Sequence, residues 1–178
     1  MSGKRSFLLC CVAAGACAGA CASKMDPPAN DDPCAPRPVA PGGSAEIGLG
    51  SDFTPITDGQ DATAVQGAQG LLMFVSSART LDMNVGSGDL EGVVVFTAFD
   101  ENDQQVSIDF RCRLREFLPH PGATGPDYRY MTEQFNLALD PSFDSRLEGA
   151  TVTLQLDVQD VDGRKATSRR TVIAHLSN

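Results

Sequence analysis

The stretch Val93–Leu114, VVVFTAFDENDQQVSIDFRCRL, decides the predicted fold class of this 178-residue chain. Its first part, Val93–Phe99, is apolar on both faces, which is typical of a strand in the middle of a sheet. Its last part, Val106–Leu114, alternates apolar with polar residues, as a strand does when one face is buried and the other is solvated. The acidic turn Asp100–Asp103 lies between the two parts. The stretch therefore predicts a β-hairpin.

Strand and turn patterns continue on both sides of this hairpin. Short apolar or alternating segments follow one another between turn residues, and no long segment has a helical period, although a short turn of helix fits Ser142–Leu147. The other strand candidates are Ala45–Leu49, Ala62–Val65, Leu71–Val75, Thr80–Val85, Gln134–Leu139, Thr151–Val158 and Thr167–Leu176. Alternation predicts the residues that share one face in three of them: Leu81, Met83 and Val85 in Thr80–Val85, and the inward residues Phe135, Leu137 and Leu139 in Gln134–Leu139 and Val152, Leu154, Leu156 and Val158 in Thr151–Val158. We expect about seven to nine strands in one all-β domain over residues 44–178, as in a sandwich or a barrel.

A resemblance to a known class of domain narrows this expectation. The last predicted hairpin, Val152–Ile173, turns at Val161-Asp162-Gly163-Arg164 and resembles the final two strands of the immunoglobulin-like modules of bacterial envelope proteins. The resemblance implies a single antiparallel β-sandwich with Greek-key topology. It also implies a role in binding or spacing rather than in catalysis. The tryptophan that flanks the core cysteines of antibody domains is absent, because the chain contains no Trp.

Residues 1–20 have the order of an export signal. Lys4 and Arg5 supply the positive start, an apolar run follows over residues 7–12, and small residues lead to Cys21. A retained transmembrane helix is disfavoured because the second half of the uncharged stretch is mainly Ala, Gly and Cys, which are weakly apolar. The segment resembles the precursor signals of bacterial lipoproteins, in which small residues precede a cysteine that is acylated.

Two cysteines fit the lipoprotein pattern, Cys21 and, as the alternative, Cys17. Processing before Cys21 leaves Cys34 and Cys112 as an even pair, whereas processing before Cys17 leaves an odd thiol. The resemblance implies a fatty-acyl (palmitate) anchor on Cys21 that tethers the protein to the membrane. It places the protein in the cell envelope, at the outer membrane of a Gram-negative bacterium. Secretion without a lipid is the other reading.

Residues 21–43 form the predicted tether between the anchor and the domain. Six of the chain's 11 prolines fall between Lys24 and Gly43. Proline favours extended backbone and removes hydrogen-bond donors, so this segment is expected to be a disordered, semi-rigid spacer.

Cys34 and Cys112 are the two cysteines that remain after processing before Cys21. A bridge between them would pin the end of the tether to the domain and close a loop of 78 sequence positions. Exported proteins rarely keep free thiols, which favours the disulfide. The alternative is a free buried thiol at Cys112 and a free exposed thiol at Cys34.

The long loop Glu116–Met131 is the candidate binding surface. Long loops in compact domains are often functional, and Tyr and Arg are favoured at binding hot spots. The candidate binding residues are Phe117, His120, Tyr128, Arg129 and Tyr130. A plain crossover that covers one end of the domain is the alternative reading of this loop.

Calcium is the one cofactor to consider, because Asp100, Asp103, Asp160 and Asp162 lie in acidic turns. Calcium takes about six to eight oxygen ligands, so the two turns would have to share an ion at one end of the domain. Aspartate is also an ordinary turn residue. No catalytic residue is predicted, because the two histidines form no zinc cluster and no serine lies in a nucleophile motif.

These features predict a non-enzymatic envelope lipoprotein that acts as a binding or structural accessory module for another envelope protein or a surface glycan. The formal net charge of −9 argues against nucleic acid as a partner, because phosphates repel an acidic surface. Two alternatives stay open: a calcium-stabilised adhesion module, and a secreted enzyme with an unrecognised site. The sequence does not determine the oligomeric state.

Overall fold

The computed structural model describes residues 34, 38–86, 91–108, 112–119 and 126–177. The predicted export signal, the candidate lipidation residues Cys17 and Cys21, and His120 lie outside the described residues. None of the described residues belongs to a helix that is long and apolar enough to span a lipid bilayer.

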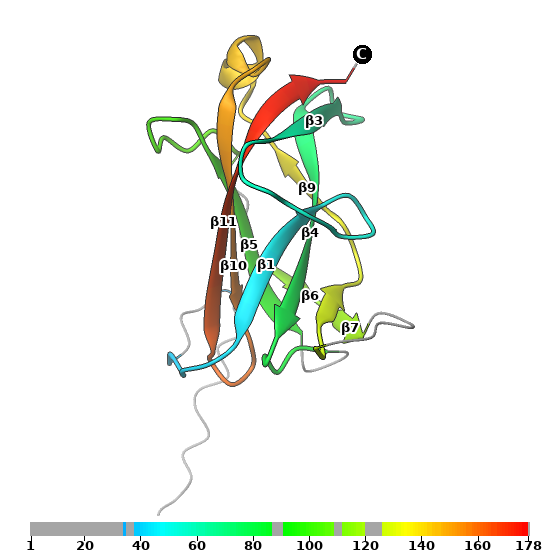
Figure 1. Ribbon diagram of the computed structural model, residues 1–178, viewed down its shortest axis with the longest axis vertical. Helices are drawn as coiled ribbons and strands as arrows, with labels where there is room; N and C mark the ends of the chain where they lie inside the picture. Colours follow the sequence, from blue (N-terminus) through cyan, green and yellow to red (C-terminus); the bar gives the residue numbers. More distant parts are fainter. Residues whose placement is uncertain (1–33, 35–37, 87–90, 109–111, 120–125, 178) are drawn as a thin grey trace, which may run out of the picture. The chain divides into compact units, whose positions relative to one another are not determined.

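The described part of the chain forms one mixed β-sheet of eleven strands that curls into a half-barrel (Figure 1). The strands are β1 (Ser44–Leu49), β2 (Thr54–Pro55), β3 (Gln60–Gln66), β4 (Leu72–Leu81), β5 (Gly92–Phe99), β6 (Arg113–Arg115), β7 (Phe117–Pro119), β8 (Arg129–Met131), β9 (Phe135–Ala138), β10 (Thr151–Gln159) and β11 (Lys165–Leu176), with the 3-10 helix η2 (Pro141–Arg146) before β10. Eight strands are neighbours in the order β2-β1-β4-β3-β11-β10-β5-β6. Strands β8 and β9 also pair with β4, and β7 pairs with β8.

Strand β3 makes the sheet continuous. Its residues Gln60–Ala64 pair in parallel with β11, and its last residues, Val65 and Gln66, pair antiparallel with β4. Because the strands on either side of β3 both hydrogen-bond to it, they belong to one sheet and do not form two separate sheets. The predicted two-sheet immunoglobulin-like sandwich is therefore wrong, and the parallel pair departs from the predicted antiparallel Greek key. Periodicity shows which residues of a strand share a face, but it does not show which distant strands pair.

The predicted hairpin over residues 93–114 is only partly present. β5 pairs with β6 at the end away from the turn, and Phe99 of β5 pairs with Gln105 directly after the turn, but Ser107 then pairs with Leu139. Val106 and Ser107 are consecutive and both buried, at 5% and 6% exposure, so the alternation of a half-solvated strand is broken there. Residues 109–111 lie outside the described residues, and the described part of the predicted strand Val106–Leu114 contains only β6 as a strand.

The core confirms the inward faces that were predicted for β10 and β9. The inward residues of β10 are at most 2% exposed: Val152, Leu154, Leu156 and Val158. Phe135 of β9 stacks on Phe96 of β5, with ring centroids 4.6 Å apart. The short helix predicted near Ser142 is present as η2, and the Asp140 carboxylate caps it by accepting from the Ser142 amide at 2.8 Å. Hydrogen bonding to Ser142 lowers the pKa of Asp140.

The end of the predicted tether lies against the turn between β10 and β11. The Ala40 amide donates to the Gly163 carbonyl at 3.0 Å. Gly163 has a φ of +84°, and a Cβ at this position would lie 2.0 Å from the Pro38 carbonyl oxygen, so the close approach requires glycine. Cys34 and Cys112 form a disulfide with their Cα atoms 5.7 Å apart. Both contacts hold the N-terminal described residues to the sheet.

Candidate functional site

A hollow of about 330 Å³ lies where β4, β8 and the turn between β10 and β11 meet. Its lining residues are Thr80, Asp82, Met83, Asn84, Asp127, Arg129, Asp162 and Arg164. We call it the Arg129 hollow. Its volume is at the lower end of the range of about 300–1,000 Å³ that is usual for small-molecule sites.

Thr80 and Arg129 meet in the hollow because they are register partners. Strand β4 pairs antiparallel with β8, and Thr80 lies directly opposite Arg129. Side chains that are opposite one another in such a pair have Cβ atoms about 5 Å apart and point to the same face. Thr80 is 1% exposed, and its hydroxyl oxygen has no hydrogen-bond partner within the described residues. An orphaned buried hydroxyl costs about 1–3 kcal/mol, so a ligand atom that pairs with it would recover this free energy.

Arg129 is half-buried and forms no hydrogen bond or ion pair in the described part of the chain. Its guanidinium group carries five donors in a planar fork, which suits a carboxylate or a phosphate. The carboxylates of Asp82 and Asp127 line the same hollow, are exposed, and likewise have no partner among the described residues. The hollow therefore presents one unpaired cation, two unpaired carboxylates and one unpaired hydroxyl.

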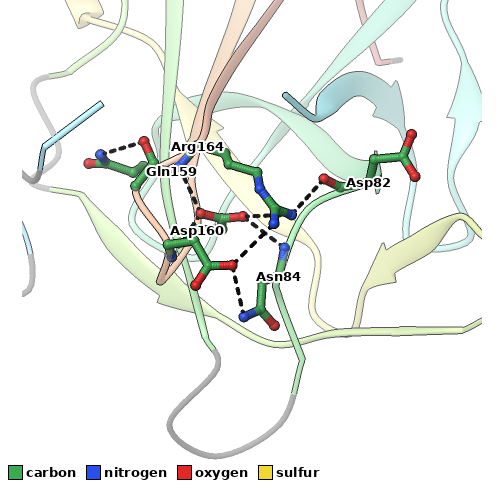
Figure 2. A network of polar contacts seen from close by, with 7 residues as sticks. Asp82, Asn84, Gln159, Asp160 and Arg164 are labelled. Atoms are coloured by element: carbon green, nitrogen blue, oxygen red, sulfur yellow. Dashed lines mark hydrogen bonds and ion pairs between the residues drawn. The ribbon is translucent and has the colours of Figure 1, made fainter. Parts of the chain in front are cut away.

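The wall beside these groups is built around the buried carboxylate of Asp160 (Figure 2). One oxygen of Asp160 accepts from the backbone amides of Asp162 at 3.0 Å and Arg164 at 2.8 Å. The other oxygen accepts from the backbone amide of Asn84 at 2.8 Å. Asp160 is 0% exposed, so these donors replace the water that the charge has lost. The carboxylate thereby ties the β10–β11 turn to the segment that follows β4.

Arg164 strengthens the same connection. Its guanidinium lies 3.7 Å from Asp160 and 3.3 Å from Asp162, and it donates to the Asp82 carbonyl at 2.9 Å. Asn84 donates to the Asp162 carboxylate at 3.1 Å. Figure 2 shows Arg164 reaching from the turn toward Asp82, with Asp160 and Asn84 on either side of it. The charges of this wall are therefore paired with one another, in contrast to those of Asp82, Asp127 and Arg129.

The predicted binding loop is split between the core, the hollow and the outer face. Strands β7 and β8 pair with each other, and β8 also pairs with β4, so much of the expected irregular loop is a hairpin. Phe117 is 0% exposed and belongs to the core. Only Arg129 of the predicted set lines the hollow, because Tyr128 and Tyr130 alternate with it along the strand. His120 lies outside the described residues.

Tyr128 and Tyr130 surround Arg79 on the outer face of β4. The Arg79 guanidinium lies 4.1 Å from the centre of the Tyr128 ring and 4.8 Å from that of Phe53. Arg79 donates to Tyr130 at 3.4 Å and makes two contacts with the Glu46 carboxylate, at 2.6 and 2.7 Å. Burial opposes the charge, but the hydrogen bonds with Tyr130 and Glu46 prevail and raise the pKa of Arg79. Arg79 of β4 therefore links β8, through Tyr130, to β1, through Glu46.

The acidic turns that were considered for calcium lie at opposite ends of the sheet. Asp100 follows Phe99, which pairs with Thr153 at the start of β10, whereas Asp160 follows the end of β10. At about 3.3 Å per residue, the length of the strand separates the two turns by roughly 20 Å. The condition for a shared ion therefore fails. Among the described residues, no group of three or more His, Cys, Asp or Glu side chains is arranged to hold a metal ion.

Each candidate calcium residue has another structural role. Asp100 accepts from the amides of Gln104 and Asn102, both at 2.9 Å, and these bonds lower its pKa. Asp103 pairs with Arg169 at 2.8 Å. Asp160 and Asp162 belong to the wall of the Arg129 hollow.

Sequence reasoning found Arg129 but missed Thr80, Asp82 and Asp127. Thr80 was expected to begin a separate strand, Thr80–Val85, on the face opposite Leu81. It instead lies near the end of β4, whose last four residues alternate, with Ala78 and Thr80 buried and Arg79 and Leu81 partly exposed. The pattern carries no local signal for this difference, because the face of Thr80 is decided by its pairing with β1 and β8.

Comparison with protein-family models, with curated proteins and with solved structures finds no match for this chain.

Proposed function

We propose that this protein is a non-enzymatic, lipid-anchored binding module of the bacterial cell envelope and that the Arg129 hollow is its recognition site. The signal-like N-terminus supports the envelope location and the anchor on Cys21. The disulfide between Cys34 and Cys112 gives weak support for an oxidising compartment outside the cytoplasm.

One observation carries the proposal for the site. A half-buried guanidinium without a partner lies opposite a buried hydroxyl without a partner, within the described residues. Internally paired charges fix the wall beside these two residues, so this part of the site does not need to reorganise before it binds. The described lining contains no His, Cys or Lys, and its groups are suited to holding a polar ligand by charge and hydrogen bonds.

The experiment is in-cell photo-crosslinking of the full-length protein with a photoreactive amino acid at Pro126, an exposed residue next to the lining residue Asp127. The captured envelope component is compared between the wild-type protein, Arg129→Ala and the control Arg113→Ala. Arg113 is exposed on β6 and does not line the hollow. We expect a recurrent adduct that disappears with Arg129→Ala and persists with Arg113→Ala.

Equal capture by both variants would refute the site, because the adduct would then not depend on the unpaired guanidinium. The anchor is tested separately with Cys21→Ser. This substitution should abolish acylation and release the protein from the membrane fraction, whereas Cys17→Ser should leave both unchanged.

A further inference from the structure

We infer that the Arg129 hollow binds a small zwitterion, an α-amino acid with a small apolar side chain. This inference rests on the proposed function and names the class of ligand for the same site. It follows from the unpaired groups that the described lining brings together: a guanidinium, a buried hydroxyl and two carboxylates.

The first half of the argument concerns the carboxylate of the ligand. Arg129 and Thr80 are register partners whose side chains leave the sheet next to one another on one face. A carboxylate accepts two parallel hydrogen bonds from a guanidinium and a further one from a hydroxyl. This arrangement satisfies the Thr80 hydroxyl, which has no other partner within the described residues.

The second half concerns the ammonium group. Asp82 and Asp127 line the same hollow and have no partner in the described part of the chain. Asp82 has a φ of +56°, and its carbonyl is held by Arg164 at 2.9 Å, so the backbone that carries this carboxylate is fixed. An ammonium group has three donors, so it can pair with two carboxylates that line one hollow.

The balance of charge excludes simpler ligands. A phosphate or another polyanion would pair with Arg129 but would face the unpaired carboxylates of Asp82 and Asp127. A simple cation would pair with these carboxylates but would face Arg129. The remaining carboxylate of the lining, Asp162, is already paired with Arg164 at 3.3 Å. Only a ligand that carries both charges satisfies every unpaired group at once.

Size and polarity limit the ligand further. The volume of about 330 Å³ admits a small molecule only. Met83 is the one apolar side chain of the described lining, and it is 6% exposed. A short aliphatic side chain therefore has an apolar surface to contact, whereas a second charged group would have no unpaired partner among these residues.

The test is isothermal titration calorimetry of the full-length protein in detergent with three related probes. Alanine carries both charges, N-acetylalanine carries only the carboxylate, and alaninamide carries only the ammonium group. We expect alanine to bind at least about tenfold more tightly than either derivative, since each derivative leaves charged hydrogen bonds unmade. Arg129→Gln should weaken alanine binding by at least about tenfold, and the control Arg113→Gln should leave it unchanged.

Thr80→Val separates a binding role from a structural one. Valine has the shape of threonine but lacks the orphaned hydroxyl, so this variant should melt at or above the wild-type temperature while binding alanine more weakly. A lower melting temperature together with unchanged alanine binding would show that the hydroxyl serves the fold, and this result would overturn the inference.

The probes also separate failure of the inference from failure of the proposed function. If N-acetylalanine binds as tightly as alanine, the site recognises an anion. If alaninamide binds as tightly as alanine, the site recognises a cation. Either result overturns the inference that the ligand is a zwitterion. If none of the three probes binds while crosslinking from position 126 still depends on Arg129, the ligand class is wrong and the site stands. If crosslinking is also unchanged by Arg129→Ala, both proposals fail.

Discussion

Replacement of Asp160 tests whether one buried carboxylate holds the wall of the Arg129 hollow together. Asp160 is 0% exposed and accepts three backbone hydrogen bonds, from Asn84, Asp162 and Arg164, at 2.8–3.0 Å. The bond from Asn84 joins positions that are 76 residues apart in the sequence. It therefore reports on tertiary structure, whereas the other two bonds belong to the turn itself.

The expected loss of stability follows from these three bonds. In Asp160→Ala three inward-facing amides lose their acceptor, which should lower the free energy of unfolding by about 3–5 kcal/mol. In Asp160→Asn the amide oxygen can still accept the two bonds of the turn, but its NH₂ group then faces the Asn84 amide, donor against donor. We expect this variant to lose about 2–3 kcal/mol. Either loss is a large part of the total of about 5–15 kcal/mol that is usual for a domain.

The assay is urea unfolding followed by circular dichroism. With a denaturant slope of about 2 kcal/mol/M, Asp160→Asn should lower the midpoint by about 1–1.5 M without changing the slope. Asp103→Asn is the matched control, because Asp103 is an exposed turn aspartate whose one ion pair, with Arg169, is at the surface. Its midpoint should stay within error of the wild type.

A midpoint for Asp160→Asn that matches the wild type would refute this reasoning. It would mean that water reaches the Asn84 amide and that the buried contact between turn and strand does not hold in solution. A loss for Asp160→Asn as large as for Asp160→Ala would show instead that the turn bonds also fail.

Three further predictions concern other parts of the structure. Cys34→Ser with Cys112→Ser opens a loop of 78 positions, so unfolding free energy should fall by up to about 4–5 kcal/mol in the chain-entropy model; a reductant should not destabilise the double variant further. Arg79→Lys keeps the charge but loses the planar fork and the ring contacts, so it should cost about 1–2 kcal/mol in urea unfolding, whereas Arg113→Lys should cost nothing measurable. Hydrogen bonds with Glu148 and Asp61 raise the pKa of His175, and the Leu176 amide together with His175 lowers the pKa of Glu148. The contribution of His175 to the free energy of unfolding is complete below its ordinary pKa of 6.5 and is lost as pH rises through the pKa of the folded state. The contribution of Glu148 is complete above its ordinary pKa of 4.5 and is lost as pH falls through the pKa of the folded state. The melting temperature should therefore differ most between wild type and His175→Gln between about pH 4.5 and 6.5, and a difference that persists undiminished at pH 9 would contradict this.

The candidate site was predictable only in part. Arg129 was identified from its residue type and its place between two tyrosines in a Pro- and Gly-rich segment. Thr80, Asp82 and Asp127 carry no such signal, because each is an ordinary strand or turn residue until the fold brings it to the hollow. Asp160 and Asp162 were noticed for their charge, but the Asp160 carboxylate accepts from three backbone amides and lies 3.7 Å from the Arg164 guanidinium.

Alternation and turn residues in the amino-acid sequence were enough to predict the all-β class, most strand positions and the inward faces of strands such as β9 and β10. These are local properties, because alternation within one strand decides which side chains are removed from water. The parallel pairing of β3 with β11, the continuity of the curled sheet and the pairing of Thr80 with Arg129 are seen only in the tertiary structure. Such pairings depend on the combined packing and loop closure of segments far apart in the chain, and no local pattern records them.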